Sequence, residues 1–183
     1  MGELYQVKRN TEKAISQYEK ILERQPRFTQ AYIALGTIYD AMGNRAEARS
    51  MYEKALEIDP NFAPAANNLA WLLLQQGDDP HGALDLAKRA AALAPDDPHV
   101  ADTLGLAFIV NGMYGNAIVE LRNATEKMPD NPTVHYHLGL AHFENGDVDE
   151  AQEILRKALR ISQTFPEKEE TRILLAEIEP GER

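Results

Sequence analysis

A repeat period of 34 or 35 residues constrains the fold of this chain more than any other feature. Proline, glycine, alanine and leucine-glycine positions all recur at this step along the sequence. The recurring prolines are Pro26, Pro60, Pro95 and Pro129, and the recurring glycines are Gly43, Gly77, Gly112 and Gly146. Such self-similarity indicates a repeat architecture, in which each unit buries its apolar face against its neighbours.

Each period is predicted to form two helices. In residues 29–62, Tyr32 and Tyr39 are seven residues apart and therefore lie on one helical face. Gly43 ends that first helix, and Pro60 stops the second because proline cannot continue a helix. The sequence therefore predicts an all-α chain of helix-turn-helix units.

Small residues in the first helices are expected to let the paired helices approach closely. They are Gly36, Ala70, Gly105 and Gly139, and the facing residues that fill the space are Tyr52, Leu121 and Leu155. The third period departs from this pattern, because Ala70 replaces the glycine and Ala87 replaces the large facing residue.

This pattern resembles the tetratricopeptide repeat, whose signature is W-x2-L-G-x2-Y, then A-x3-F, then P. Residues 32–60 and 101–129 carry it most completely. The resemblance implies a right-handed α-α superhelical solenoid that forms a single array over residues 1–183. The expected repeats are 1–28 (truncated), 29–62, 63–97, 98–131 and 132–165, followed by a capping helix over residues 166–179.

The two ends of the array are expected to differ. The C-terminal cap should turn Ile173, Leu174, Ala176 and Ile178 inward, and Pro180-Gly181 should end it. The first period begins only at Gly2 and lacks such a cap. We therefore expect the C-terminal part of a longer repeat protein or a chain that begins within a repeat, although a naturally short first helix is an alternative. The uncapped end also suggests self-association.

Composition argues against several classes of function. Lys and Arg number 19 and Asp and Glu number 29, so the formal net charge is -10. An acidic chain is repelled by phosphate groups, which argues against nucleic acid as a partner. The absence of cysteine excludes disulfides and thiolate metal sites. Direct membrane insertion is not expected, since no apolar run approaches the roughly 20 residues that span a bilayer.

Histidines and acidic residues are predicted to have structural roles. His135, His137 and His142 lie on one predicted helix, but their spacing is not that of helical zinc ligands, so buried histidines with satisfied partners are favoured. The acidic pairs Asp78-Asp79 and Asp96-Asp97 should cap helices rather than bind calcium. We expect no metal, no cofactor and no catalytic residue.

A stripe along the first helices is predicted to line the concave groove that the resemblance implies. The partner-binding residues of this predicted groove are Ile33, Thr37, Asp40, Asn67, Trp71, Leu74, Asp102, Leu106, Ile109, Tyr136, Leu140 and Phe143. The stripe has no Lys or Arg, which argues against the terminal-carboxylate clamp of the family. Its apolar character instead suits an amphipathic helix or an apolar extended segment as partner.

Two interpretations of the stripe stay open at this point. Its residues could pack mainly between repeats, and Asn67 and Asp102 could form a structural polar ladder or grip a partner backbone. The chain could accordingly act as an interaction scaffold, or as a structural spacer that assembles through its N-terminal end. Residues 67–71, 101–105, 136–139 and 165–167 also resemble bacterial repeat lipoproteins of exopolysaccharide and PEP-CTERM systems, which implies a periplasmic or envelope setting for the full-length protein.

Overall fold

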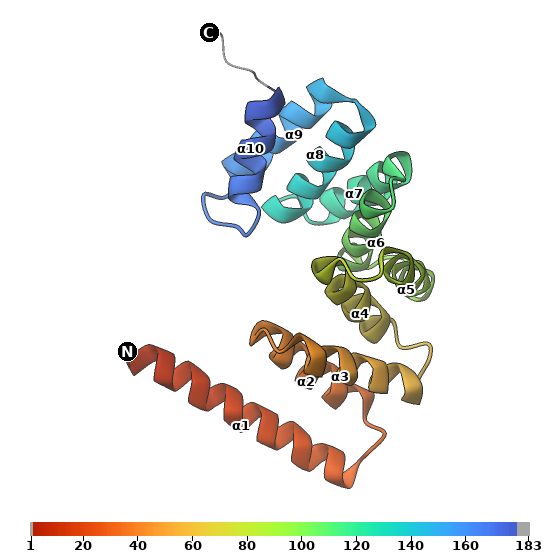
Figure 1. The fold of residues 1–183 in the computed structure, drawn as a ribbon, viewed down its shortest axis with the longest axis vertical. Helices are drawn as coiled ribbons and strands as arrows, with labels where there is room; N and C mark the ends of the chain where they lie inside the picture. Colours follow the sequence, from red (N-terminus) through yellow and green to blue (C-terminus); the bar gives the residue numbers. More distant parts are fainter. Residues whose placement is uncertain (1, 179–183) are drawn as a thin grey trace.

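The computed structural model describes residues 2–178, which form ten helices without a strand in that range (Figure 1). The helices are α1 (Gly2–Arg24), α2 (Thr29–Ala41), α3 (Arg45–Ile58), α4 (Ala63–Gln76), α5 (Pro80–Leu93), α6 (Pro98–Val110), α7 (Tyr114–Lys127), α8 (Pro132–Asn145), α9 (Val148–Ile161) and α10 (Lys168–Ile178). Within residues 2–178, no helix is both long and apolar enough to cross a membrane.

The helices stack in sequence order and form an all-α superhelical solenoid (Figure 1). Each helix packs against its neighbours along the chain, and the contacts are most extensive within the pairs α2–α3, α4–α5, α6–α7 and α8–α9. In addition, α2 contacts α4, α4 contacts α6, and α6 contacts α8, whereas successive outer helices such as α5 and α7 make no comparable contact. The first helices therefore lie closer together than the second helices do, and they form the inner face of the curved stack.

Glycines end the first helices, as the sequence predicts. Gly43, Gly77, Gly112 and Gly146 have positive φ angles of 76°, 70°, 71° and 88°. Glycine adopts this left-handed backbone without the steric penalty that a Cβ would impose. The chain can thus reverse within a few residues and begin the second helix of each pair.

Close packing within the helix pairs confirms the prediction that a small residue on the first helix faces a large residue on the second. A Cβ added to Gly139 would lie 2.6 Å from Leu155 Cδ2, so the glycine leaves the space that the leucine fills. In the pair formed by α4 and α5, the equivalent positions are both alanine. Ala70 and Ala87 are both fully buried in the central core. The extra methyl group on α4 is matched by the smaller residue on α5.

Acidic residues cap two of the helices as expected. The backbone N–H of Gly82 donates to Asp79 Oδ1 at 2.9 Å, and that of His99 donates to Asp97 Oδ1 at 2.9 Å. Such bonds satisfy backbone donors that have no partner inside the helix. These two side chains therefore fix the entry of the chain into α5 and α6.

The first helix is one unbroken segment of 23 residues. The repeat pattern predicts two helices in every period, but residues 2–24 form only one. Arg9 stands at the position that holds glycine in the other four periods. Without a residue that readily adopts positive φ, the helix continues past this point. Among the other helices, α1 packs mainly against α2.

The predicted inward face of the C-terminal helix is partly wrong. Ile173 is 61% exposed and Ala176 is also exposed, so neither residue faces the core. Leu174 is buried as expected, Ile178 is half-buried, and Thr171 is fully buried. Residue 179 and Pro180-Gly181, which were expected to complete and end this helix, lie outside the described residues.

The inward face of α10 carries a buried polar residue, Thr171, which hydrophobicity alone does not reveal. The Thr171 hydroxyl donates to the Glu167 carbonyl at 2.7 Å, which satisfies a polar group inside the interface. Thr171 and Leu174 then lie on one face with half-buried Leu175. Hydrophobic residues occur around most of α10, so its sequence alone permits more than one inward face.

Candidate binding surface

The predicted groove residues lie on the inner helices α2, α4, α6 and α8. Thr37 is exposed, whereas Ile109 is only 8% exposed and belongs to the central core. The remaining residues of the predicted groove are half-buried, namely Ile33, Asp40, Asn67, Trp71, Leu74, Asp102, Leu106, Tyr136, Leu140 and Phe143. The stripe is therefore a partly open surface rather than a fully exposed one.

Some of these residues also hold the repeats together. Leu74 and Leu140 pack against the central core cluster, and Ile33 packs against the cluster around Tyr52 and Leu72. The packing interpretation therefore applies to these three residues, and the binding interpretation stays a prediction for the residues with accessible surface. Ile109 offers little surface to a partner, while half-buried residues such as Trp71 keep part of their side chains accessible.

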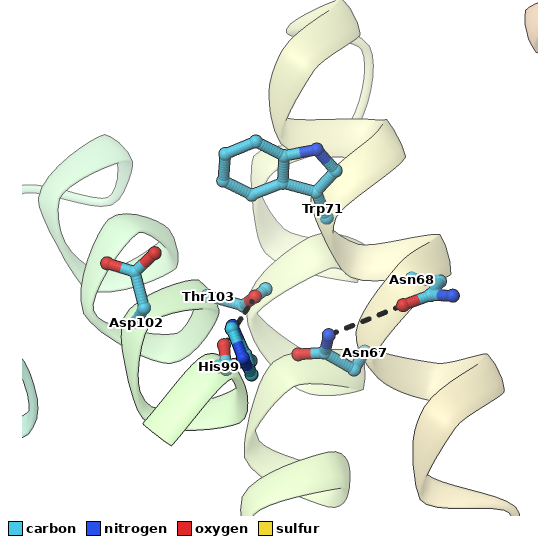
Figure 2. Close-up of a pocket in the computed structure, with 6 residues that line it drawn as sticks. All are labelled: Asn67, Asn68, Trp71, His99, Asp102 and Thr103. Atoms are coloured by element: carbon cyan, nitrogen blue, oxygen red, sulfur yellow. Dashed lines mark hydrogen bonds between the residues drawn. The ribbon is translucent and has the colours of Figure 1, made fainter. Parts of the chain in front are cut away.

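A hollow of about 320 Å³ opens between α4 and α6 (Figure 2). Its lining residues are Asn67, Asn68, Trp71, His99, Asp102 and Thr103. The groove prediction included Asn67, Trp71 and Asp102 but missed the other three. Asn68 and Thr103 each follow a predicted groove residue directly, so extending the stripe by one position would have found them.

The amide of Asn67 is only partly satisfied. Its Nδ2 donates a long hydrogen bond of 3.5 Å to Asn68 Oδ1, and Figure 2 shows its Oδ1 turned toward α6. This oxygen is buried and has no hydrogen-bond partner within the part of the chain that the structure describes. Leaving a buried acceptor unpaired costs about 1–3 kcal/mol, so a donor that reaches it gains correspondingly.

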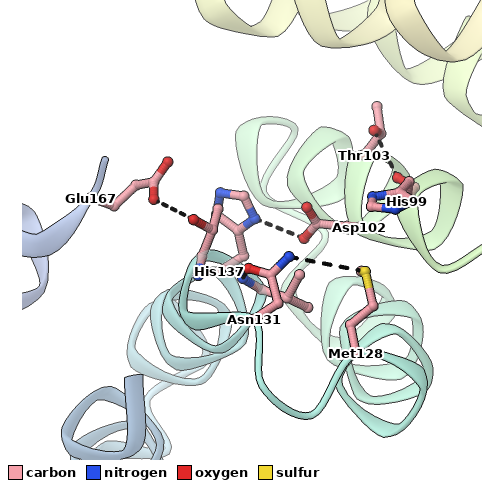
Figure 3. Close-up of polar contacts among 9 residues, drawn as sticks. His99, Asp102, Thr103, Met128, Asn131, His137 and Glu167 are labelled. Atoms are coloured by element: carbon pink, nitrogen blue, oxygen red, sulfur yellow. Dashed lines mark hydrogen bonds and ion pairs between the residues drawn. The ribbon is translucent and has the colours of Figure 1, made fainter. Parts of the chain in front are cut away.

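A histidine-carboxylate pair forms the wall beside this hollow. His137 Nδ1 lies 2.7 Å from Asp102 Oδ1, and the two side chains are 4% and 13% exposed (Figure 3). Burial is the largest influence on the imidazole and lowers its pKa. The charge of Asp102, the hydrogen bond to it and the charge of Glu167 together outweigh burial, so the pKa of His137 is raised.

Aromatic contacts connect this pair to the neighbouring helices. The ring centroid of His137 lies 6.2 Å from that of Trp71 on α4 and 5.6 Å from that of Tyr136 on α8. On the other side, the Thr133 hydroxyl donates to Glu167 Oε2 at 2.8 Å (Figure 3). The inner face from α4 to the start of α10 is therefore one connected set of polar and aromatic groups.

The three histidines of α8 have separate partners. His135 Nε2 is 2.9 Å from the Pro129 carbonyl oxygen, and His142 Nδ1 is 3.1 Å from Asp147 Oδ2. Each ring is 3% exposed. All three histidines are buried as predicted and each has a partner for one ring nitrogen, but Nε2 of His142 has none among the described side chains. The described part of the chain contains no group of three or more His, Asp or Glu side chains that could hold a metal ion.

The electrostatic character of the inner face is uniform. Helices α2, α4, α6 and α8 contain no Lys or Arg, and they carry Asp40, Asp102 and Glu144. All 19 basic residues of the chain lie on other segments. The surface can thus offer acceptors, aromatic faces and negative charge, but no ammonium or guanidinium group for an anionic ligand.

Sequence models of the tetratricopeptide repeat match three stretches of the chain. Two of them overlap, at residues 29–62 and 51–84, and the third lies at residues 108–167. Together these matches extend over most of the α2–α5 region and over α7 to the start of α10. They include the pocket residues of α4 but not those at the start of α6. Among curated protein sequences, none matches the chain.

Solved structures share the fold over nearly the whole chain. PilW, described as a widely conserved type IV pilus biogenesis factor, aligns with a TM-score of 0.80 at 19% identity, covering 97% of this chain and 81% of its own. YrrB, described as a tetratricopeptide-repeat protein with an unusual peptide-binding site, gives 0.70 at 24% identity, with 97% and 88% covered. PilF of Pseudomonas aeruginosa gives 0.70 at 27% identity, with 86% and 70% covered.

Proposed function

Because the chain belongs to the tetratricopeptide-repeat family, we propose that it is a non-catalytic scaffold that binds a partner peptide or helix on its inner face. The observation that carries this proposal is the hollow between α4 and α6, which is lined by polar side chains and by the half-buried aromatic ring of Trp71. Aromatic residues that keep accessible surface next to unsatisfied polar groups are typical of binding sites.

The shape and chemistry of the inner face favour an elongated partner. The predicted groove residues lie on four successive inner helices, so a bound segment would cross several repeats rather than fill one deep cavity. Leu106 lies between the groove residues of α4 and those of α8 in the order of the stack, and it is half-buried. YrrB, which is described as having an unusual peptide-binding site, illustrates that this fold can carry one.

Selection from a library of random short peptides tests the proposal. The wild-type protein is used as bait, and the recovered peptides are measured by calorimetry against Leu106→Glu, which places a charge in the middle of the stripe. Val119→Glu is the matched control, because Val119 is 66% exposed on the outer helix α7. We expect Leu106→Glu to weaken binding at least tenfold and Val119→Glu to leave it unchanged, with circular dichroism showing both variants folded.

Equal binding by wild type and folded Leu106→Glu would contradict the groove. If Leu106→Glu unfolds, the milder Leu106→Gln replaces it, and the same comparison applies. Because the selection uses random peptides, it requires no assumption about the natural partner.

A second candidate function is a structural spacer that assembles through its first helix. Among the described helices, α1 packs mainly against α2, and its 23 residues extend beyond the length of its neighbours. Sedimentation velocity over a range of protein concentrations tests this candidate. Association that persists in Leu106→Glu would favour the spacer, and the resemblance to bacterial repeat lipoproteins would then suggest an envelope protein as its setting.

A further inference from the structure

We propose that the hollow between α4 and α6 receives a lysine or arginine side chain of the partner segment. This inference rests on the proposed function and names the chemistry that the inner face recognises. It is argued from the acceptors, the aromatic face and the charge of the six residues that line the hollow.

Two acceptor-bearing side chains line the hollow from the two helices that flank it. Asn67 Oδ1 on α4 is buried and lacks a hydrogen-bond partner among residues 2–178. Asp102 on α6 accepts from His137 through Oδ1, and a carboxylate has a second oxygen that can accept from a ligand. The ligand group that fits must therefore donate hydrogen bonds, which a lysine ammonium or an arginine guanidinium does with several N–H groups at once.

The aromatic wall favours a cation over a neutral donor. Trp71 lines the same hollow as Asn67 and Asp102, and Figure 2 shows its indole ring above the Asn67 side chain. The indole face attracts a cation more strongly than the other aromatic side chains do. A neutral amide or hydroxyl from the partner would satisfy Asn67 but would gain nothing from the ring or from the charge of Asp102.

The negative charge of the inner face argues against an acidic ligand group. Helices α2, α4, α6 and α8 contain no Lys or Arg, and Asp40, Asp102 and Glu144 give them negative charge. An acidic side chain or a terminal carboxylate in the hollow would lie beside Asp102, and the inner helices have no lysine or arginine to bind it. A basic group from the partner complements this surface and is steered toward it.

The volume of the hollow limits the size of the ligand group that it can hold. Its volume of about 320 Å³ is at the lower end of the range for ligand pockets, which begins near 300 Å³. A single long side chain fits this space, with its aliphatic stem against the indole and its charged end at Asn67 and Asp102. The rest of the partner would lie along the stripe on α6 and α8.

The experiment uses the peptides recovered in the library selection on wild-type protein. We expect a lysine or arginine at one fixed position, flanked by apolar residues. Synthetic versions with norleucine in place of lysine, or citrulline in place of arginine, keep the size but remove the charge. Trp71 is the single tryptophan of the chain, so its fluorescence reports the occupation of this hollow directly.

Three variants locate the effect. Asp102→Asn removes the charge, and we expect the basic peptide to bind roughly tenfold more weakly, because the amide oxygen accepts a hydrogen bond without the negative charge that strengthens it. Asn67→Ala removes the buried acceptor without touching His137 and should weaken binding several-fold. Asp85→Asn removes one exposed negative charge from the outer helix α5 and should change nothing.

The outcomes separate this inference from the proposed function. If peptides lose binding in Leu106→Glu but tolerate norleucine or citrulline, and bind Asp102→Asn and Asn67→Ala normally, the groove stands and the cation site is wrong. If no peptide binds wild type, or if Leu106→Glu binds as well as wild type, both are wrong. Should Asp102→Asn fail to fold, Asn67→Ala and the uncharged peptides decide the question.

Discussion

His137 Nδ1 and Asp102 Oδ1 are 2.7 Å apart, which ties a buried imidazole on α8 to a carboxylate on α6 of the preceding repeat. Asp102 belongs to the predicted groove, and His137 directly follows Tyr136, a groove residue of the next repeat. It holds the inner faces of two repeats together and fixes the orientation of one wall of the α4–α6 hollow.

The two buried histidines His135 and His137 are expected to titrate on opposite sides of the ordinary histidine value of 6.5. Burial chiefly lowers the pKa of His135, and its bond to the Pro129 carbonyl offsets this only in part. For His137, Asp102 and Glu167 outweigh burial and raise the pKa. A pH titration followed by NMR of the imidazole resonances measures both, and pKa values in the reverse order would contradict this account.

The raised pKa of His137 predicts a stability that depends on pH. The folded protein binds the proton more tightly than the unfolded chain, so this contribution is fully present below the unfolded value of 6.5 and is lost as pH rises through the folded pKa. Urea unfolding of wild type and His137→Gln on both sides of this window is the measurement. The stability difference between them should shrink as pH rises, and a constant difference would contradict the ion pair.

Gly139 and Leu155 are expected to be strongly coupled. Gly139→Ala should destabilise the protein by about 1–3 kcal/mol, because the new Cβ overlaps the Leu155 side chain. Leu155→Ala should cost about 2–5 kcal/mol through the cavity that it leaves. The double variant recreates the Ala70 and Ala87 pair of the third repeat, so its cost in urea unfolding should be clearly smaller than the sum of the two. If the two losses of stability were simply additive, the proposed matching of residue volumes between Gly139 and Leu155 would be wrong.

Glycines in different backbone conformations should respond oppositely to alanine. Gly146 ends α8 with a φ of 88°, so Gly146→Ala should cost about 1–2 kcal/mol. Gly115 lies in α7 with nothing near its missing Cβ, so Gly115→Ala should stabilise by about 0.5 kcal/mol. Thermal unfolding of the two variants against wild type checks the difference in sign.

The C-terminal helix offers a matched test of its observed rotation. Leu174 is 8% exposed and Ile173 is 61% exposed, although the two are adjacent in sequence. Leu174→Ala should cost about 2–4 kcal/mol, whereas Ile173→Ala should stay within about 0.5 kcal/mol of wild type. Chemical denaturation of both variants measures this, and similar costs would mean that α10 packs differently in solution.

Much of the fold could be predicted from residues whose effect is local. Gly43 and the glycines at equivalent positions end helices because of a backbone preference, and this holds wherever they lie in the fold. Gly139 and Leu155 match because the repeat period brings the same two positions together in every helix pair. The predicted groove residues do lie on the inner helices, but their use as a binding surface stays a proposal.

Other features depend on how neighbouring elements meet. Ile109 was predicted to line the groove, yet it is buried in the central core, because the curvature of the stack decides how deep each inner position lies. Ile173 was predicted to face inward, but it is exposed, and the inward face of α10 carries the buried Thr171 and Leu174. Neither outcome could be read from the period of apolar residues along a single helix.

By itself, the sequence determined that this chain forms helix pairs with a regular step, because periodicity, glycine and proline act over a few residues at a time. Only the tertiary structure decided that His137 meets Asp102, and that Asn67, Trp71 and Asp102 surround one hollow. The reason is that Asp102 lies in a different repeat from His137 and from Asn67 and Trp71, about 35 positions away in either direction. Their distances depend on the superhelical rotation between repeats, which is the sum of many small packing contacts.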